Sequence, residues 1–110
     1  MEKNYDIIVI GSGIGGLASA SLLTKIFKKK VLVIERHGKL GGLTHTFKRL
    51  DKYKWDVGLH YVGALEKSGP TEKLFSYITG GKLNWIKMPH HFEKFIYPNF
   101  DFTVPIVRQV

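Results

Sequence analysis

The chain has 110 residues, with 17 Lys or Arg against 9 Asp or Glu, which gives a formal net charge of +8 at pH 7. It contains no cysteine, which excludes disulfides, thiolate metal sites and cysteine nucleophiles and fits a reducing compartment. The positive balance suits an anionic partner such as a dinucleotide or a membrane surface, but the charges are dispersed and no predicted helix carries a basic, aromatic stripe, so nucleic-acid binding is not expected.

Residues 5–10 form the first predicted strand, because four consecutive apolar residues rich in β-branched side chains are typical of a strand covered on both faces. The run is far shorter than a bilayer span, so neither a transmembrane segment nor a signal peptide is expected. A Gly-x-Gly-x-x-Gly turn follows at Gly11, Gly13 and Gly16, with Gly15 as an additional glycine. We expect Gly11 to allow the tight turn, Gly13 to leave room for a pyrophosphate, and Gly16 to let helix and strand pack closely.

A helix is predicted over residues 14–27, and its nearly continuous apolar and small residues indicate that it is mostly buried. The free N–H groups of its first turn, which begins at Ile14, are expected to point at a phosphate. A second buried strand is predicted over 31–34 and ends at Glu35. A carboxylate there can accept hydrogen bonds from both ribose hydroxyls of an adenosine, and it disfavours NADP unless Arg36 turns inward. An ordinary glycine turn and a solvated carboxylate are the alternatives.

A glycine pair, Gly41 and Gly42, lies five residues after Glu35. With this pair the sequence resembles flavin-dependent oxidoreductases of the amine oxidase and phytoene desaturase type. The resemblance implies FAD as cofactor, with the segment from Gly41 to Thr44 along the inner side of the cofactor, where close backbone approach offers N–H groups to phosphate oxygens. A flexible surface loop over residues 36–42 is the alternative.

Two further motifs are Gly-Gly-x-x-His-Thr-Phe over 41–47 and Asp-x-Gly-x-His-Tyr-x-Gly over 56–63. Together they look like the retinol saturase and carotenoid isomerase branch of the phytoene desaturase family. This resemblance implies an oxidoreductase that saturates, desaturates or isomerises carbon-carbon double bonds of a hydrophobic polyene or isoprenoid substrate. We expect a cytoplasmic protein. A polyene substrate that resides in lipid favours association with a membrane surface, but the sequence shows no amphipathic anchor that would support it. The alternatives are an amine oxidase-like flavoprotein and a truncated, non-catalytic nucleotide-binding fragment.

The remaining elements are predicted from turn residues and from alternation of apolar side chains. Strands over 43–50 and 53–63 flank a turn at 51–52, and an extended segment spans 83–89. A helix is capped by Ser68 or Gly69, has Pro70 in its first turn and stops at Gly80. Strands over 92–97 and 100–104 flank Pro98-Asn99, and the second of these strands is expected to bury one face.

The histidines do not indicate a metal site. His45, His60, His90 and His91 lack helical i, i+4 spacing and acidic neighbours of the kind that accompany catalytic zinc. Each of His45 and His60 is either a structural histidine or a residue near the flavin or polyene, and no catalytic residue is identified.

Together, these elements predict an α/β fold. Residues 1–65 are expected to be the N-terminal part of a Rossmann-like FAD-binding domain with a βαβ unit, and residues 66–110 to begin a substrate-binding region with a mixed sheet. Because the first strand lacks a second parallel neighbour in this sequence, we expect the chain to be the N-terminal portion of a longer enzyme. The remainder of that enzyme would be its partner, and the 110 residues alone would be inactive.

Overall fold

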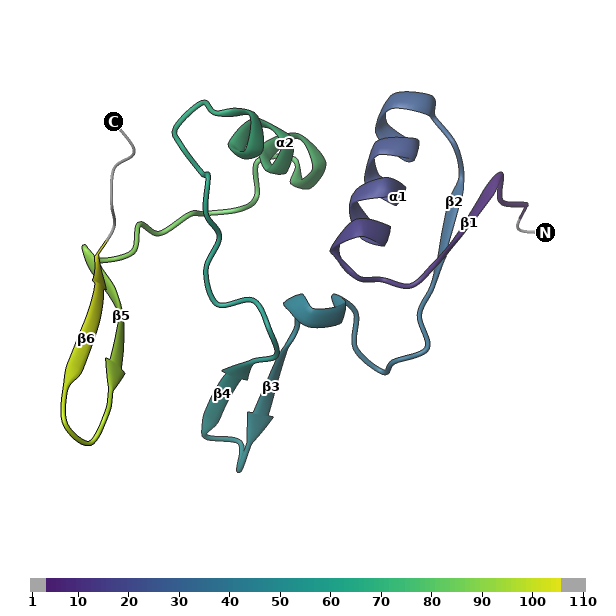
Figure 1. Ribbon diagram of the computed structural model, residues 1–110. Helices are drawn as coiled ribbons and strands as arrows, with labels where there is room; N and C mark the ends of the chain where they lie inside the picture. Colours follow the sequence, from purple (N-terminus) through teal and green to yellow (C-terminus); the bar gives the residue numbers. More distant parts are fainter. Residues whose placement is uncertain (1–3, 106–110) are drawn as a thin grey trace.

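The computed structural model describes residues 4–105. Residues 1–3 of the predicted cofactor-binding part and residues 106–110 of the predicted substrate-binding region lie outside the described residues. The elements in chain order are β1 (Ile7–Ile10), α1 (Ile14–Phe27), β2 (Val31–Ile34), the 3-10 helix η1 (Gly42–Thr44), β3 (Thr46–Arg49), β4 (Tyr53–Asp56), α2 (Pro70–Thr79), β5 (His91–Ile96) and β6 (Asp101–Pro105) (Figure 1).

The first unit is β1-α1-β2, and it has the predicted parallel arrangement. Ile7 pairs with Val31 and Ile10 with Ile34, so the two strands run side by side in register. The helix between them ends at Phe27, and the next residue, Lys28, has a left-handed backbone (φ 53°) that turns the chain back towards β2. The predicted α/β fold class is therefore confirmed.

Two antiparallel hairpins, β3–β4 and β5–β6, account for the other strands. The predicted turns at 51–52 and 98–99 are confirmed, and Tyr97 N–H donates to the carbonyl of Phe100 at 3.0 Å across the second turn. The predicted strand over 53–63 ends at Asp56. Beyond Asp56 the chain forms hydrogen bonds with residues 43–45 instead. The donors are the N–H groups of Val57, Gly58 and Leu59, and the acceptors are the carbonyls of His45 and Leu43.

Helix α2 begins and ends at the predicted residues, with Gly69 at its N-terminus and left-handed Gly80 (φ 66°) at its C-terminus. Its C-terminal end is fastened to α1. The hydroxyl of Ser21 donates to the carbonyl of Ile78 at 2.8 Å, and the ammonium of Lys25 donates to the same carbonyl at 3.2 Å and to that of Tyr77. The predicted extended segment that follows, 83–89, contains no strand.

The interior is much smaller than the sequence predicts. Apart from glycine, the buried residues within 4–105 are Ser12 and Ala20. Helix α1, predicted to be mostly buried, leaves Phe27 62% exposed, and the expected buried face of 100–104 is open at Phe100 and Phe102. These predictions are wrong because each sheet within residues 4–105 has only two strands, and large apolar side chains of these sheets remain exposed.

The overall dimensions agree with this small interior. The radius of gyration is 18.5 Å, compared with about 13 Å for a compact domain of this size. Figure 1 shows the βαβ unit and the two hairpins arranged side by side rather than packed in layers. No helix within 4–105 is both long and apolar enough to cross a bilayer.

Candidate dinucleotide-binding site

The glycine turn between β1 and α1 leaves its backbone open. Gly11 has φ 97°, a left-handed value that favours glycine, and Gly13 precedes the helix in an extended conformation. A Cβ atom placed on Gly13 or Gly15 would meet nothing within 4 Å. The first helical turn contains no acidic residue. The backbone N–H groups that begin α1 can therefore be approached by an anion, which the helix dipole also attracts.

Close packing between helix and strand depends on Gly16. A Cβ atom there would lie 2.1 Å from the carbonyl oxygen of Gly11, a distance that no side chain tolerates. Residue 16 must therefore be glycine if the turn is to keep this shape, and the role that we expect for it in packing matches the geometry.

The glycine pair lies directly against this turn. Gly41 and Gly13 form an isolated parallel bridge, and Gly41 N–H donates to the carbonyl of Ser12 at 3.0 Å. Both residues of the pair have positive φ, and a Cβ on Gly42 would lie 3.0 Å from Cα of Gly13. Gly13 and Gly41, which are far apart in the sequence, thus form one continuous stretch of bare backbone. The hydroxyl of Thr44 donates to Gly41 at 2.6 Å and so supports the pair.

Glu35 is fixed at the same place by three hydrogen bonds. Its Oε2 accepts from the N–H and from the hydroxyl of Ser12, both at 2.7 Å, and its Oε1 accepts from the N–H of His37 at 2.8 Å. These donors, the N–H of His37 first and then those of Ser12, lower the pKa of Glu35 from its ordinary 4.5 to about 2. A carboxylate has about four acceptor sites, so the fixed, ionised group retains capacity for another donor.

Ser12 is the site residue that the sequence analysis did not identify. It is completely buried, its hydroxyl binds Glu35, and the same hydroxyl oxygen accepts from the N–H of Gly41 at 3.3 Å. It therefore connects the glycine turn, the acid after β2 and the glycine pair. The signal available in the sequence was a small hydroxyl residue between the first two glycines of the turn.

The other expected site residues lie around this group. Ile14 and Arg36 are exposed at its edge, and Arg36 follows Glu35 directly. Nδ1 of His45 donates to the carbonyl of Gly42 at 2.5 Å, and its ring stacks on that of His37 with centroids 5.1 Å apart. Nδ1 of His60 lies 3.7 Å from Oδ2 of Asp56. Within 4–105, no three His, Cys, Asp or Glu residues are grouped as a metal would require.

A parallel βαβ unit with an open glycine turn and a fixed acid after the second strand defines a dinucleotide-binding protein of the Rossmann type. The comparison with protein families agrees, since the model described as NAD(P)-binding Rossmann-like domain matches residues 9–78. The chain belongs to this family of NAD(P)-binding Rossmann-like domains.

Individual relatives extend the comparison. All-trans-retinol 13,14-reductase of Danio rerio is 43% identical over 96 residues, which are 87% of this chain and 16% of that protein. A protein named inactive all-trans-retinol 13,14-reductase, also of Danio rerio, is 39% identical over 93 residues (84% of this chain, 15% of that protein). Amine oxidase [flavin-containing] A of Equus caballus is 42% identical over 59 residues (54% and 11%).

These relatives confirm the resemblance to the retinol saturase branch and to the amine oxidases. The chain spans about one sixth of the length of the retinol reductases that it matches. No solved structure gives a significant match.

Proposed function

We propose that this chain is the FAD-binding N-terminal portion of an oxidoreductase that acts on carbon-carbon double bonds of a polyene or isoprenoid lipid. The observation that carries the proposal is the bare backbone formed by Gly13 and Gly41, with the carboxylate of Glu35 fixed beside it. The names of its relatives, retinol 13,14-reductases and flavin-containing amine oxidases, support the flavin and the lipid substrate.

The residues present fit a bound FAD. The diphosphate would lie along Gly11, Gly13 and the first turn of α1 from Ile14 to Gly16, and the ionised Glu35 would accept a hydrogen bond from the ribose. On the other side the cofactor would meet Gly41, Gly42 and Thr44, with Arg36 at the rim. The bound flavin would supply hydride transfer, while these residues bind and orient it. The fixed negative charge of Glu35 disfavours a 2′-phosphate and hence NADP.

We expect the cofactor and the substrate to be bound by different parts of the chain. Residues 1–65 would hold the cofactor and residues 66–110 would begin the substrate region, whose exposed aromatic side chains suit a hydrophobic ligand. The exposed apolar faces of α1 and β1 would be covered by further chain of the same enzyme. We expect a cytoplasmic enzyme, peripheral to the membrane, that does not bind nucleic acid, and no turnover from the 110 residues alone.

Bleaching of flavin absorbance also distinguishes the proposed function from two alternatives. Similarity to an amine oxidase over 54% of the chain favours an amine substrate as the first alternative. The relative named as inactive makes a nucleotide-binding protein without turnover the second alternative. Bleaching of flavin absorbance by a retinoid under anaerobic conditions supports the lipid substrate; bleaching by an amine supports the first alternative, and bound flavin without bleaching by either supports the second.

The cofactor itself is tested by flavin absorbance of the purified protein. Gly13→Val should abolish flavin uptake, because its side chain occupies the space that a diphosphate would take. Gly63→Val is the matched control, since a Cβ there also meets nothing within 4 Å. Full flavin occupancy in Gly13→Val would show that the phosphates bind elsewhere, and colourless wild-type protein that takes up no added FAD would contradict the proposal.

A further inference from the structure

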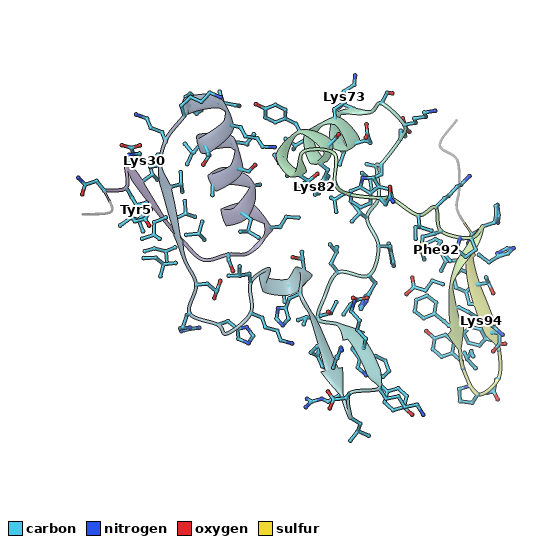
Figure 2. The ribbon with its side chains drawn as sticks, turned by 180° about the vertical axis from the view of Figure 1, so that it is seen from behind. Tyr5, Lys30, Lys73, Lys82, Phe92 and Lys94 are labelled. Carbon is cyan, nitrogen blue, oxygen red and sulfur yellow. The ribbon has the colours of Figure 1, made fainter. Side chains whose placement is uncertain are left out.

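Ser12 lies where the glycine turn, the acid after β2 and the glycine pair meet. These segments meet at the carboxyl ends of the two parallel strands, opposite the ends that carry Tyr5 and Lys30 (Figure 2). In open α/β sheets, ligands bind beyond the carboxyl ends of the strands. Ser12 is completely buried, so water cannot replace a hydrogen bond that its hydroxyl loses.

The hydrogen bonds around Ser12 determine where its hydroxyl hydrogen points. A serine hydroxyl donates one hydrogen bond and can accept two. The N–H of Gly41 approaches the hydroxyl oxygen at 3.3 Å, and an N–H group can only donate. The hydroxyl hydrogen is therefore directed to Oε2 of Glu35, 2.7 Å away. A bond of this length to a carboxylate is charge-assisted, which makes it stronger than a bond between neutral groups.

The two oxygens of the Glu35 carboxylate differ in the acceptor capacity that they have left. Each carboxylate oxygen can accept about two hydrogen bonds. Oε2 accepts two, from the N–H and from the hydroxyl of Ser12. Oε1 accepts one from the N–H of His37, at 2.8 Å. The remaining acceptor position is therefore on Oε1.

Oε1 is also the oxygen on the accessible side of the carboxylate. Its donor, His37, is exposed, whereas Ser12, the donor to Oε2, is completely buried. A sugar hydroxyl could bind Oε2 only by displacing the Ser12 hydroxyl, and this would leave a buried donor without an acceptor. Such a loss is more costly than leaving the sugar hydroxyl in contact with water.

We propose that Ser12 is a specificity-determining residue that restricts Glu35 to one hydroxyl of a nucleotide ribose. The spacing of the sequence allows the acid to bind both ribose hydroxyls, but the Ser12 hydroxyl occupies the acceptor position that the second one would need. The ligand is an adenosine diphosphate group, held through a single hydrogen bond from its sugar to Oε1. This inference rests on the proposed function, because it requires a ribose beside Glu35.

The proposal is tested with ADP, 2′-deoxy-ADP and 3′-deoxy-ADP, whose binding to the purified protein is measured by isothermal titration calorimetry. One deoxy analogue should bind about tenfold more weakly than ADP, because it lacks a hydrogen bond to an ionised group, and the other should bind about as well as ADP. Equal losses with both analogues, or no loss with either, would overturn the inference and leave the nucleotide site in place. No binding of ADP would overturn the proposed function as well.

The variant Ser12→Ala distinguishes this role from a structural one. It removes one of the two bonds that hold Oε2 in the interior, so Oε2 can turn towards the ligand and accept from the second hydroxyl. The two analogues should then bind with nearly equal affinity. Ser21→Ala is the matched control, because it removes a hydroxyl of α1 that donates to the carbonyl of Ile78, and it should keep the tenfold difference. A tenfold difference retained in Ser12→Ala would contradict the proposed role.

A second variant tests the acceptor itself and does not depend on the folding of Ser12→Ala. Glu35→Ala removes the carboxylate, so ADP and both deoxy analogues should bind equally, at the affinity of the weaker analogue for the wild-type protein. Circular dichroism shows whether each variant keeps its helices. If Glu35→Ala still discriminates between the analogues, another residue reads the sugar and the inference is wrong.

Discussion

The βαβ unit and the C-terminal hairpin differ in how their geometry is determined. In the βαβ unit and the glycine pair beside it, Ser12, Gly16 and Gly41 are held by hydrogen bonds or by contacts that admit no side chain. In the β5–β6 hairpin, Phe100 and Phe102 are more than half exposed, and the hairpin contacts the rest of the chain at Tyr61. The ring of Tyr61 packs edge-on against Phe92, and its hydroxyl donates to Glu93 at 3.3 Å.

This comparison shows that hydrogen bonds and close backbone contacts within the chain are sufficient to shape the candidate site. Burial of the apolar side chains, in contrast, requires additional packing partners. The glycine turn folds back on residues within thirty positions of it, and so it is complete within this chain. Large apolar side chains of α1 and of both hairpins stay exposed among residues 4–105. Variants in the βαβ unit should therefore have larger effects than variants in the C-terminal hairpin.

The largest effect is expected from two adjacent glycines that should respond in opposite directions. Gly16→Ala should destabilise the βαβ unit by about 3 kcal/mol, because its Cβ would overlap the carbonyl of Gly11. Gly15→Ala, which meets nothing within 4 Å, should stabilise α1 by about 1 kcal/mol. Urea denaturation followed by circular dichroism measures both. Equal effects would show that the close packing at Gly16 is absent in solution.

The second effect is a dependence of stability on pH. The pKa of Glu35 falls from 4.5 to about 2 on folding, so its ionisation stabilises the folded state above pH 4.5, and this stabilisation is lost as the pH falls towards 2. Glu35→Gln should remove this part of the pH profile of the unfolding free energy. Ser12→Ala should raise the pKa of Glu35 towards 4.5, measurable by NMR titration of the carboxyl carbon. An unshifted pKa in wild-type protein would contradict the observed hydrogen bonds.

The same comparison explains what the sequence could predict. The bounds of α1 and α2 and the turns of both hairpins follow from Gly, Pro and β-branched residues, which act on the chain within a few positions. The expected placement of Glu35 beside the glycine turn follows from its spacing, but its bonds to Ser12 require the three-dimensional fold. Burial of Phe27 and Phe102 was wrongly predicted because apolar side chains indicate that a face can be covered and not what covers it.

A smaller effect is expected where α2 is fastened to α1. Lys25→Met removes a cation from carbonyls at the C-terminal end of α2 and from above the ring of Tyr77, 5.3 Å away. We expect a loss of about 1 kcal/mol and faster amide hydrogen exchange in α2, because the bond is charge-assisted and partly buried. Lys73→Met, on the exposed side of α2, should change neither quantity. Unchanged exchange in Lys25→Met would mean that the two helices associate without this contact.

The smallest effect is expected in the C-terminal hairpin, where Lys94 and Asp101 form an exposed ion pair. Exposed pairs contribute about 0.2–1 kcal/mol, since solvent screens the charges and ordering the side chains costs entropy. A double-mutant cycle with Lys94→Gln and Asp101→Asn should therefore give a coupling energy in that range, and salt should reduce it. Loss of amide protection across β5 and β6 in either single variant would show that the hairpin depends on this pair. In that case the C-terminal region would be determined as locally as the glycine turn, and the contrast between the two regions would no longer hold.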